Sequence, residues 1–123
     1  MSEDGFAEKD MYKTVRQRIR QRFKAIDGWD IYEQDNWGAI IPDFVAERRH
    51  KGYIERAIIE VKGTCSSKQE HIDQINRYAK YLAGNNCRIV EKILVYPGSS
   101  DTQLLEDFYN DITVIKLRNF FCY

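Results

Sequence analysis

Two charged residues, Glu60 and Lys62, occur where they could act together in a chemical step. They lie two residues apart at the end of the most apolar segment of the chain, Ala57-Ile58-Ile59. This spacing places both side chains on one face of a strand. Charged groups at the end of a buried strand are costly unless they are paired or bound to a metal. The position of the two residues therefore makes them candidates for a functional site.

Asp43 is expected to face Glu60 across a hairpin. A turn at the Lys51–Gly52 bond would place these two carboxylates opposite each other, with Cβ atoms about 4.5–5.5 Å apart. Two carboxylates this close repel each other unless a cation lies between them. With oxygen ligands, Mg²⁺ or Mn²⁺ is the natural occupant. The prediction depends on the register, because a slip of one residue would move Asp43 to the other face.

Two acids and a lysine around a hard metal ion suit the hydrolysis of a phosphodiester bond. The ion would polarise the phosphate and lower the pKa of a bound water. Lys62 could orient or deprotonate that water, or stabilise the charge that develops on the phosphate. These residue types therefore predict metal-dependent phosphodiester hydrolysis.

The hydrophobic pattern predicts the elements that must position these residues. Helices are expected near Phe6–Ile26, over Ser67–Leu82 and in a short segment opening at Ser100, with Ser67 and Ser100 as capping residues. The expected strands are Trp29–Tyr32, Ala39–Arg48, Tyr53–Lys62, Ile89–Tyr96 and Ile112–Leu117.

The order α-β-β-β-α-β-α-β predicts an α/β (α+β) fold. We expect a mixed sheet of four to five strands, antiparallel at first and parallel later, with helices on its faces. The chain has 123 residues and no Ser/Gly/Pro-rich linker, so one domain over 1–123 is expected.

Composition excludes several classes of protein. With 43% hydrophobic and 31% charged residues, the chain is too apolar for disorder and too charged for a membrane protein. The acidic start of the sequence is not typical of a secretory signal, and three scattered cysteines make a structural zinc site improbable. We therefore expect a cytoplasmic protein with reduced thiols.

The motif of two acids and a lysine resembles that of a known family. Pro42-Asp43, sixteen residues and then Glu60-Val61-Lys62 resemble the PD-(D/E)xK signature of the restriction-endonuclease-like nuclease superfamily. That family commonly opens with a helix bearing a glutamate, for which Glu8 is the candidate. The helix after its lysine often carries a glutamine and then a tyrosine, as Gln74 and Tyr78 do here. Glu-x-Lys alone is a weak signal, but the combination is fairly specific.

The resemblance spans roughly Glu8 to Leu117 and implies a restriction-endonuclease-like core. It further implies that Asp43 and Glu60 bind Mg²⁺, for which Mn²⁺ can substitute, together with the Val61 carbonyl. Glu8 would be an outer contact of the metal or its water. Glu3 could take the place of Glu8 if the first helix starts earlier.

The same resemblance implies a DNA endonuclease in which Lys62 is the catalytic lysine and Gln74 an accessory residue of the site. The nuclease domains of type I restriction motor subunits and the small archaeal-type junction resolvases have a similar local pattern. A larger restriction or repair complex is therefore a possible partner, and a homodimer is another, because two-fold symmetry pairs two sites for cutting both strands.

Contacts to a nucleic-acid backbone would have to come from a local patch. Lys and Arg number 19, as do Asp and Glu, so the formal net charge is zero, whereas dedicated non-specific binders are usually basic. The candidates are Arg16 and Arg20 on the first helix and Arg48, Arg49 and Lys51 at the hairpin tip. Both groups are equally compatible with an ordinary solvated surface.

Other interpretations of the candidate site stay open. Taken alone, Asp43 is more typical of a turn, Glu60 with Lys62 of a surface ion pair, and Gln74 of a solvated helix. A non-catalytic nucleic-acid-binding or assembly module on the same fold is the alternative function. A small-molecule phosphate enzyme is less favoured, because no Gly-rich phosphate loop occurs.

Overall fold

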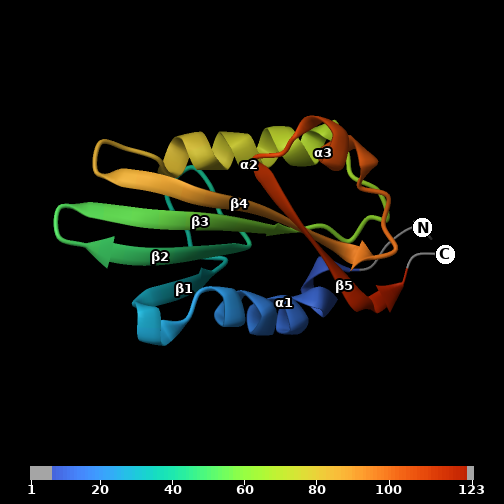
Figure 1. Cartoon of the computed structure of the whole chain (residues 1–123), viewed down its shortest axis with the longest axis horizontal. Coiled ribbons are helices and arrows are strands. Elements are labelled where there is room, and N and C mark those ends of the chain that lie inside the picture. The colour runs from blue at the N-terminus through green and yellow to red at the C-terminus, as the bar shows by residue number, and fades with distance from the viewer. Residues whose placement is uncertain (1–6, 122–123) are drawn as a thin grey trace.

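The computed structural model describes residues 7–121 as a mixed α/β fold built on one open, five-stranded sheet (Figure 1). The strands lie in chain order, β1-β2-β3-β4-β5, and the first three are antiparallel whereas β3, β4 and β5 are parallel. Their bounds are β1 Trp29–Glu33, β2 Phe44–His50, β3 Tyr53–Val61, β4 Cys87–Gly98 and β5 Ile112–Phe121. The predicted switch from antiparallel to parallel pairing is thus confirmed.

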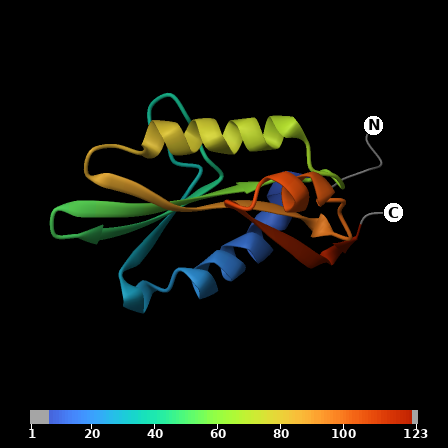
Figure 2. The same cartoon turned by 45° about the horizontal axis from the view of Figure 1, so that its top comes forward.

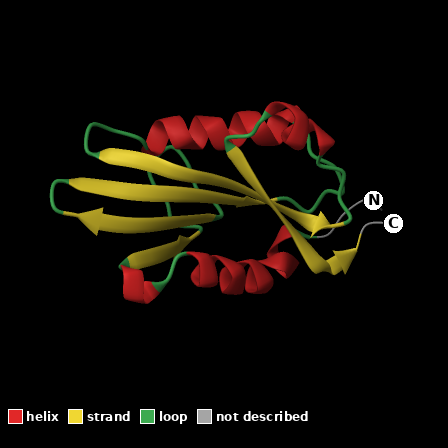
Figure 3. Ribbon diagram, viewed as in Figure 1, coloured by secondary structure: helices red, strands yellow, loops and turns green. Residues whose placement is uncertain are grey.

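The main helices cover opposite faces of the sheet (Figures 2 and 3). The helix α1, Glu8–Arg22, precedes the sheet, and α2, Gln69–Leu82, makes the crossover between β3 and β4. Two shorter elements are the 3₁₀ turn η1, Ala25–Asp27, and α3, Gln103–Phe108, which connects β4 to β5. Each parallel connection needs a crossover of this kind, because parallel strands cannot be joined by a tight turn.

Two hydrophobic cores lie on the two faces of β3. Ile59 belongs to the cluster beneath α1, and its neighbour Ile58 belongs to the cluster beneath α2. Both side chains are fully buried, because successive residues of a strand point to opposite faces. This two-sided burial explains why the segment is continuously apolar.

The β2–β3 hairpin has the predicted register. Its pairs run from His50↔Tyr53 at the tip to Phe44↔Ile59. Gly52 turns the chain with a φ of 89°, a left-handed conformation that glycine adopts at little cost. The tight turn fixes every pair that follows, up to the residues that adjoin Asp43 and Glu60.

Several predicted element boundaries are wrong. The first helix ends at Arg22 instead of Ile26, because Phe23 leaves the helical conformation and buries its ring against Trp29. The second strand begins at Phe44 instead of Ala39, and β4 extends beyond Tyr96 to Gly98. The expected start at Phe6 lies outside the described residues.

Neither predicted serine cap forms. The N-cap residues of α2 and α3 are Lys68 and Thr102, and neither makes a side-chain capping hydrogen bond. Ser67 precedes the cap of α2 by one residue, and its N–H donates to the Asp101 carbonyl at 2.8 Å. The Ser100 hydroxyl instead donates to the Pro97 carbonyl at 2.5 Å. Ser67 therefore lies one residue, and Ser100 two residues, before the N-cap position of the helix that each was predicted to cap.

Two expectations from composition can be compared with the described part of the chain. Cys87 is a free thiol, but Cys65 is disulfide-bonded, so the prediction of reduced thiols throughout is wrong at Cys65. Within residues 7–121, no helix is both long and apolar enough to cross a membrane. Glu3 lies outside the described residues, so its role as a substitute for Glu8 stays a prediction.

The packing beneath α1 predicts a clear stability difference between two isoleucines. Ile59→Ala opens a cavity at a fully buried position and should lower the free energy of unfolding by about 2–5 kcal/mol. Ile26→Ala changes a side chain that is 92% exposed and should stay within about 0.5 kcal/mol of the parent. Urea unfolding measures both, and equal stability of the two variants would contradict this packing.

Candidate active site

Asp43 and Glu60 adjoin each other where the β2–β3 ladder ends. They follow the last paired residues, Phe44 and Ile59, as the register requires. The Asp43 N–H donates to Glu60 Oε2 at 2.6 Å, and the Val61 N–H donates to Asp43 Oδ2 at 2.7 Å. Each carboxylate thus takes a backbone N–H of the neighbouring chain segment, which holds the two acids side by side.

Pro42 ends the ladder and leaves backbone groups for other partners. Continuing the register by two residues would place Pro42 opposite Val61. Proline has no N–H, so it cannot donate to the Val61 carbonyl as an ordinary strand partner would. The Val61 N–H already bonds to Asp43. The proline next to the acid therefore explains why regular pairing stops where the carboxylates begin.

Burial makes the two carboxylates unusual acids. Glu60 is only 3% exposed, and burial together with the Asp43 charge raises its pKa to about 8. Burial also raises the pKa of Asp43, although hydrogen bonds from Tyr12 and from the Val61 N–H act in the opposite direction. The pair therefore resists carrying two negative charges unless a positive charge comes close.

Lys62 supplies positive charge beside the acids and is held by α2. Its charge lowers the pKa values of both Asp43 and Glu60. Its ammonium group donates a hydrogen bond to Gln74 Oε1. Gln74 Nε2 in turn donates to the Tyr78 hydroxyl at 3.2 Å, one helical turn further along α2. The structure thus joins Lys62 and Gln74, both predicted site residues, and adds Tyr78 to them.

Glu8 reaches the same place from the first turn of α1. The pKa of Glu8 is raised by partial burial and by the Asp43 charge, and lowered by Lys62 and by a hydrogen bond from the Gly63 N–H. The first turn of α1 therefore lies beside the loop that follows β3, as Figure 1 also shows. All of the predicted catalytic and metal-binding residues are brought together at this end of β3.

Two residues of the site were missed in the sequence. The Tyr12 hydroxyl donates a hydrogen bond to Asp43 Oδ1, and Gln34 Nε2 donates to the Tyr12 oxygen at 3.0 Å. Tyr12 follows Glu8 by four residues, so a helical spacing from the predicted glutamate could have found it. Gln34 lies just after β1, and nothing in its local sequence indicates the site.

A hollow opens beside Lys62 between β3 and α2. It has a volume of about 400 Å³ and is lined by Lys62, Glu70, His71, Asp73, Gln74 and Arg77. His71 is nearly buried, with Nδ1 2.7 Å from the Tyr96 hydroxyl. Desolvation lowers the pKa of His71 to about 4, and the charges of Lys62 and Lys68 act in the same direction. His71 is therefore neutral near pH 7, and the cations of the hollow are Lys62 and Arg77.

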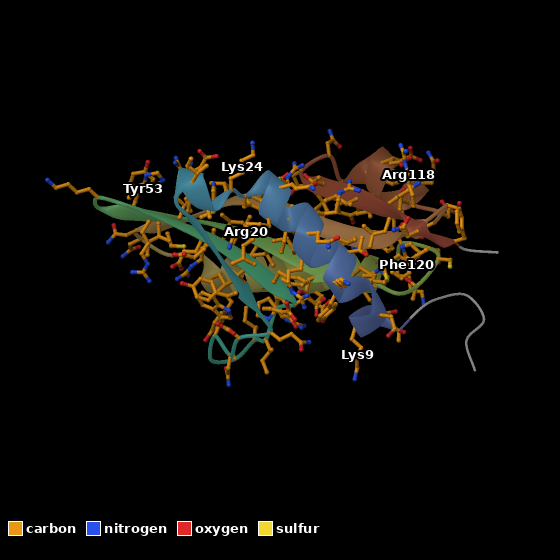
Figure 4. All side chains as sticks on the ribbon, turned by 90° about the horizontal axis from the view of Figure 1, so that it is seen from below. Lys9, Arg20, Lys24, Tyr53, Arg118 and Phe120 are labelled. Atoms are coloured by element: carbon orange, nitrogen blue, oxygen red, sulfur yellow. The ribbon has the colours of Figure 1, made fainter. Side chains whose placement is uncertain are left out.

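Of the residues predicted to contact nucleic acid, those at the hairpin tip lie away from the two acids. The hairpin tip, with Lys51, is separated from Glu60 by nearly the whole length of β3, about 25 Å at the usual strand rise. Figure 4 shows Tyr53, at that tip, well away from Lys9, which is next to Glu8.

Most of the predicted nucleic-acid contacts are already engaged within the protein. Arg16 forms a two-pronged ion pair with Glu33, Arg48 pairs with Glu55, and Arg49 pairs with Glu47. Arg20 donates to the Phe23 and Trp29 carbonyls at the end of α1. The three ion pairs reduce the positive charge that Arg16, Arg48 and Arg49 present, and the carbonyl bonds occupy donors of Arg20. The role of these arginines as phosphate contacts stays a prediction.

The donor set of the site fits a hard divalent cation. Two carboxylates and a main-chain carbonyl are ligands that Mg²⁺ accepts, with waters completing its octahedron. Burial raises the pKa of both carboxylates, and at Glu60 the Asp43 charge raises it further; a bound cation would offset both effects. No cluster of three or more His, Cys, Asp or Glu side chains close enough to hold a metal occurs within residues 7–121. A metal there would therefore depend on two side chains, the backbone and water.

Comparisons with known proteins give no match. No protein-family model, no curated protein and no solved structure matches this chain.

The raised pKa of Glu60 predicts an unusual pH dependence of stability. An acid whose pKa rises from 4.5 to about 8 on folding favours the folded state while it is protonated, and this contribution is lost as the pH rises toward 8. His71 acts in the opposite direction, but only below its unfolded value of 6.5. Between pH 6.5 and 8 the metal-free protein should therefore lose stability.

Urea unfolding across this range, beside Glu60→Gln, measures the effect. The variant has no carboxyl to ionise, so its stability should change less with pH than that of the parent. Mg²⁺ should stabilise the parent most at the alkaline end, where protons no longer compete for the carboxylates. Equal pH slopes for parent and variant would contradict the assignment.

Proposed function

We propose that the protein is a metal-dependent nuclease with a restriction-endonuclease-like core, hydrolysing phosphodiester bonds in DNA. The observation that carries the proposal is the buried pair of Asp43 and Glu60, held side by side with the ammonium group of Lys62 close by. Burying two like charges together is costly, and cation binding offers a reason for keeping them.

The proposed mechanism assigns the metal ion to Asp43, Glu60 and the Val61 carbonyl, with Glu8 as an outer contact. When bound, Mg²⁺ polarises the phosphate and lowers the pKa of a water. Glu8 lies on the α1 side of the acids, where it can accept a hydrogen bond from a water of the ion. These groups would hold the ion, and the hollow beside Lys62 would leave room for the scissile phosphate.

Lys62 acts on the attacking water and on the charge of the phosphate. Its ammonium group has three N–H donors, one of which is taken by Gln74 Oε1. The others can orient the water and stabilise negative charge as it develops on the phosphate oxygens. Gln74, held by Tyr78, keeps the long lysine side chain in place and so reduces the entropy lost when the substrate binds.

The hollow beside Lys62 supports a phosphate-bearing substrate. Arg77 projects into it from α2, one helical turn beyond Gln74, and can contact a phosphate next to the scissile one. The edge of the site exposes Ile41, which is 55% accessible and could pack against a sugar or base. Cutting both strands of a duplex would need two sites, so a homodimer or a larger restriction or repair complex belongs to the same proposal.

A non-catalytic nucleic-acid-binding or assembly module on this fold is the second candidate. The observation in its favour is that Asp43 accepts hydrogen bonds on both oxygens, from Tyr12 and from the Val61 N–H, within the protein alone. Such bonds would also be expected if the acids only stabilised the open end of the β2–β3 hairpin. The alternative leaves unexplained why Lys62 is held beside the acids by Gln74 instead of pairing with either of them.

A cleavage assay with two substitutions tests the nuclease proposal. With Mg²⁺ or Mn²⁺, the parent should cut linear, supercoiled or branched DNA. Asp43→Asn removes a ligand charge at constant shape, and Lys62→Ala removes the ammonium group. Each should lower the rate by about 100-fold or more, the usual size of such a contribution.

Matched controls come from the same chain. Asp35→Asn, in the exposed connection between β1 and β2, and Lys80→Ala, on the exposed side of α2, should keep the parental rate. RNA, run in parallel, tells whether the substrate is DNA alone. No cleavage of any substrate by the parent, with equal nucleic-acid binding by parent and variants, would favour the non-catalytic module.

A further inference from the structure

Tyr12 places a hydroxyl against Asp43 from a buried position on α1. The residue is 8% exposed, and its ring packs on Phe44 with centroids 5.3 Å apart. Phe44 directly follows Asp43 in the chain. Two consecutive residues thus contact Tyr12, Phe44 through the ring and Asp43 through the hydroxyl. The hydroxyl donates to Asp43 Oδ1.

Gln34 fixes the direction of that hydrogen bond. Its side-chain Nε2 is a donor and lies 3.0 Å from the Tyr12 oxygen, which therefore accepts. The single hydroxyl proton of Tyr12 is then left for Asp43. Gln34 also donates its backbone N–H to the Asp43 carbonyl at 3.0 Å. One residue thus contacts both Asp43 and the tyrosine that orients Asp43.

The backbone of Gln34 supports a functional role for this contact. Its φ is 50°, in the left-handed region that residues other than glycine, asparagine and aspartate seldom adopt. Such conformations cost free energy and are found most often at sites where the position of a group matters. Here the conformation places the side-chain Nε2 of Gln34 beside the Tyr12 oxygen and its backbone N–H beside the Asp43 carbonyl.

With Tyr12 in place, both oxygens of Asp43 are oriented by the protein. Tyr12 holds Oδ1, and the Val61 N–H holds Oδ2 at 2.7 Å. Each carboxylate oxygen has two lone-pair directions, so one hydrogen bond apiece leaves room for a cation. The plane of the carboxylate is therefore set before any ion arrives.

We propose that Tyr12, oriented by Gln34, is a positioning residue that presents the Asp43 carboxylate to a divalent cation. The inference rests on the proposed function, because it assumes that Asp43 is a metal ligand. Groups that hydrogen-bond to a metal ligand typically change metal affinity about 10- to 100-fold when they are removed. A merely structural tyrosine would change the stability of the fold and leave the affinity of the folded protein as it was.

Titration calorimetry with Mn²⁺ alone separates the two roles without relying on catalysis. Tyr12→Phe keeps the buried ring and removes only the hydroxyl, and it should weaken Mn²⁺ binding by about 10-fold or more. Gln34→Met removes the orienting donor and should give a smaller loss. The matched control is Tyr32→Phe, on β1, whose ring packs edge-on against Trp37; it should bind Mn²⁺ like the parent. Thermal unfolding of each variant confirms that the titrated protein is folded.

The outcomes distinguish this inference from the function on which it rests. Weaker binding by Tyr12→Phe, with parental binding by Tyr32→Phe, supports the positioning role. Parental affinity in Tyr12→Phe, while Asp43→Ala abolishes binding, would overturn the role of Tyr12 and leave the metal site standing. Binding that is absent in the parent, or unchanged in Asp43→Ala, would overturn both.

Discussion

The structure depends on how two buried carboxylates can be kept next to each other. Asp43 and Glu60 adjoin at the end of a ladder, and each accepts a hydrogen bond from a backbone N–H of the opposite segment. Those two bonds offset part of the desolvation penalty that raises both pKa values. The two bonds do not remove the repulsion between the two carboxylates, and this repulsion is the reason to expect a cation. A site of this kind is a compromise in which the metal-free fold gives up stability for affinity.

Three layers of the fold meet at this point, and each contributes one kind of group. The sheet supplies the acids and the lysine from the ends of β2 and β3. The helix α1 adds Glu8 and Tyr12, and α2 adds Gln74, which holds Lys62. The two helices lie on opposite faces of the sheet (Figure 2). Groups from both helices meet the acids where the β2–β3 ladder stops, just beyond the pair of Phe44 and Ile59.

The sequence was most informative where one local feature, such as a tight turn, fixes the positions of residues further along the chain. The turn at Gly52 sets the register of β2 and β3, so the meeting of Asp43 and Glu60 could be predicted eight residues away. Gln74, by contrast, was indicated only by the resemblance to the PD-(D/E)xK signature, and not by its spacing from Lys62. Gln34 could not be predicted, because its role follows from where β1 ends and how α1 docks. Arg16 shows the same limit, because its ion pair with Glu33 joins α1 to the end of β1 through a contact that local sequence does not reveal. The pair of Arg49 and Glu47 lies on one strand at a spacing of two and is local.

We propose above that Asp43 and Glu60 form a site for a divalent cation. Anomalous diffraction from crystals grown with Mn²⁺ tests it most directly, since the signal locates the ion without any assumption about substrate or activity. We expect one strong peak within bonding distance of an oxygen of each carboxylate, on the side of Lys62. A saturating concentration of Mn²⁺ that gives no peak there, with both carboxylates still bonded only to the protein, would contradict it.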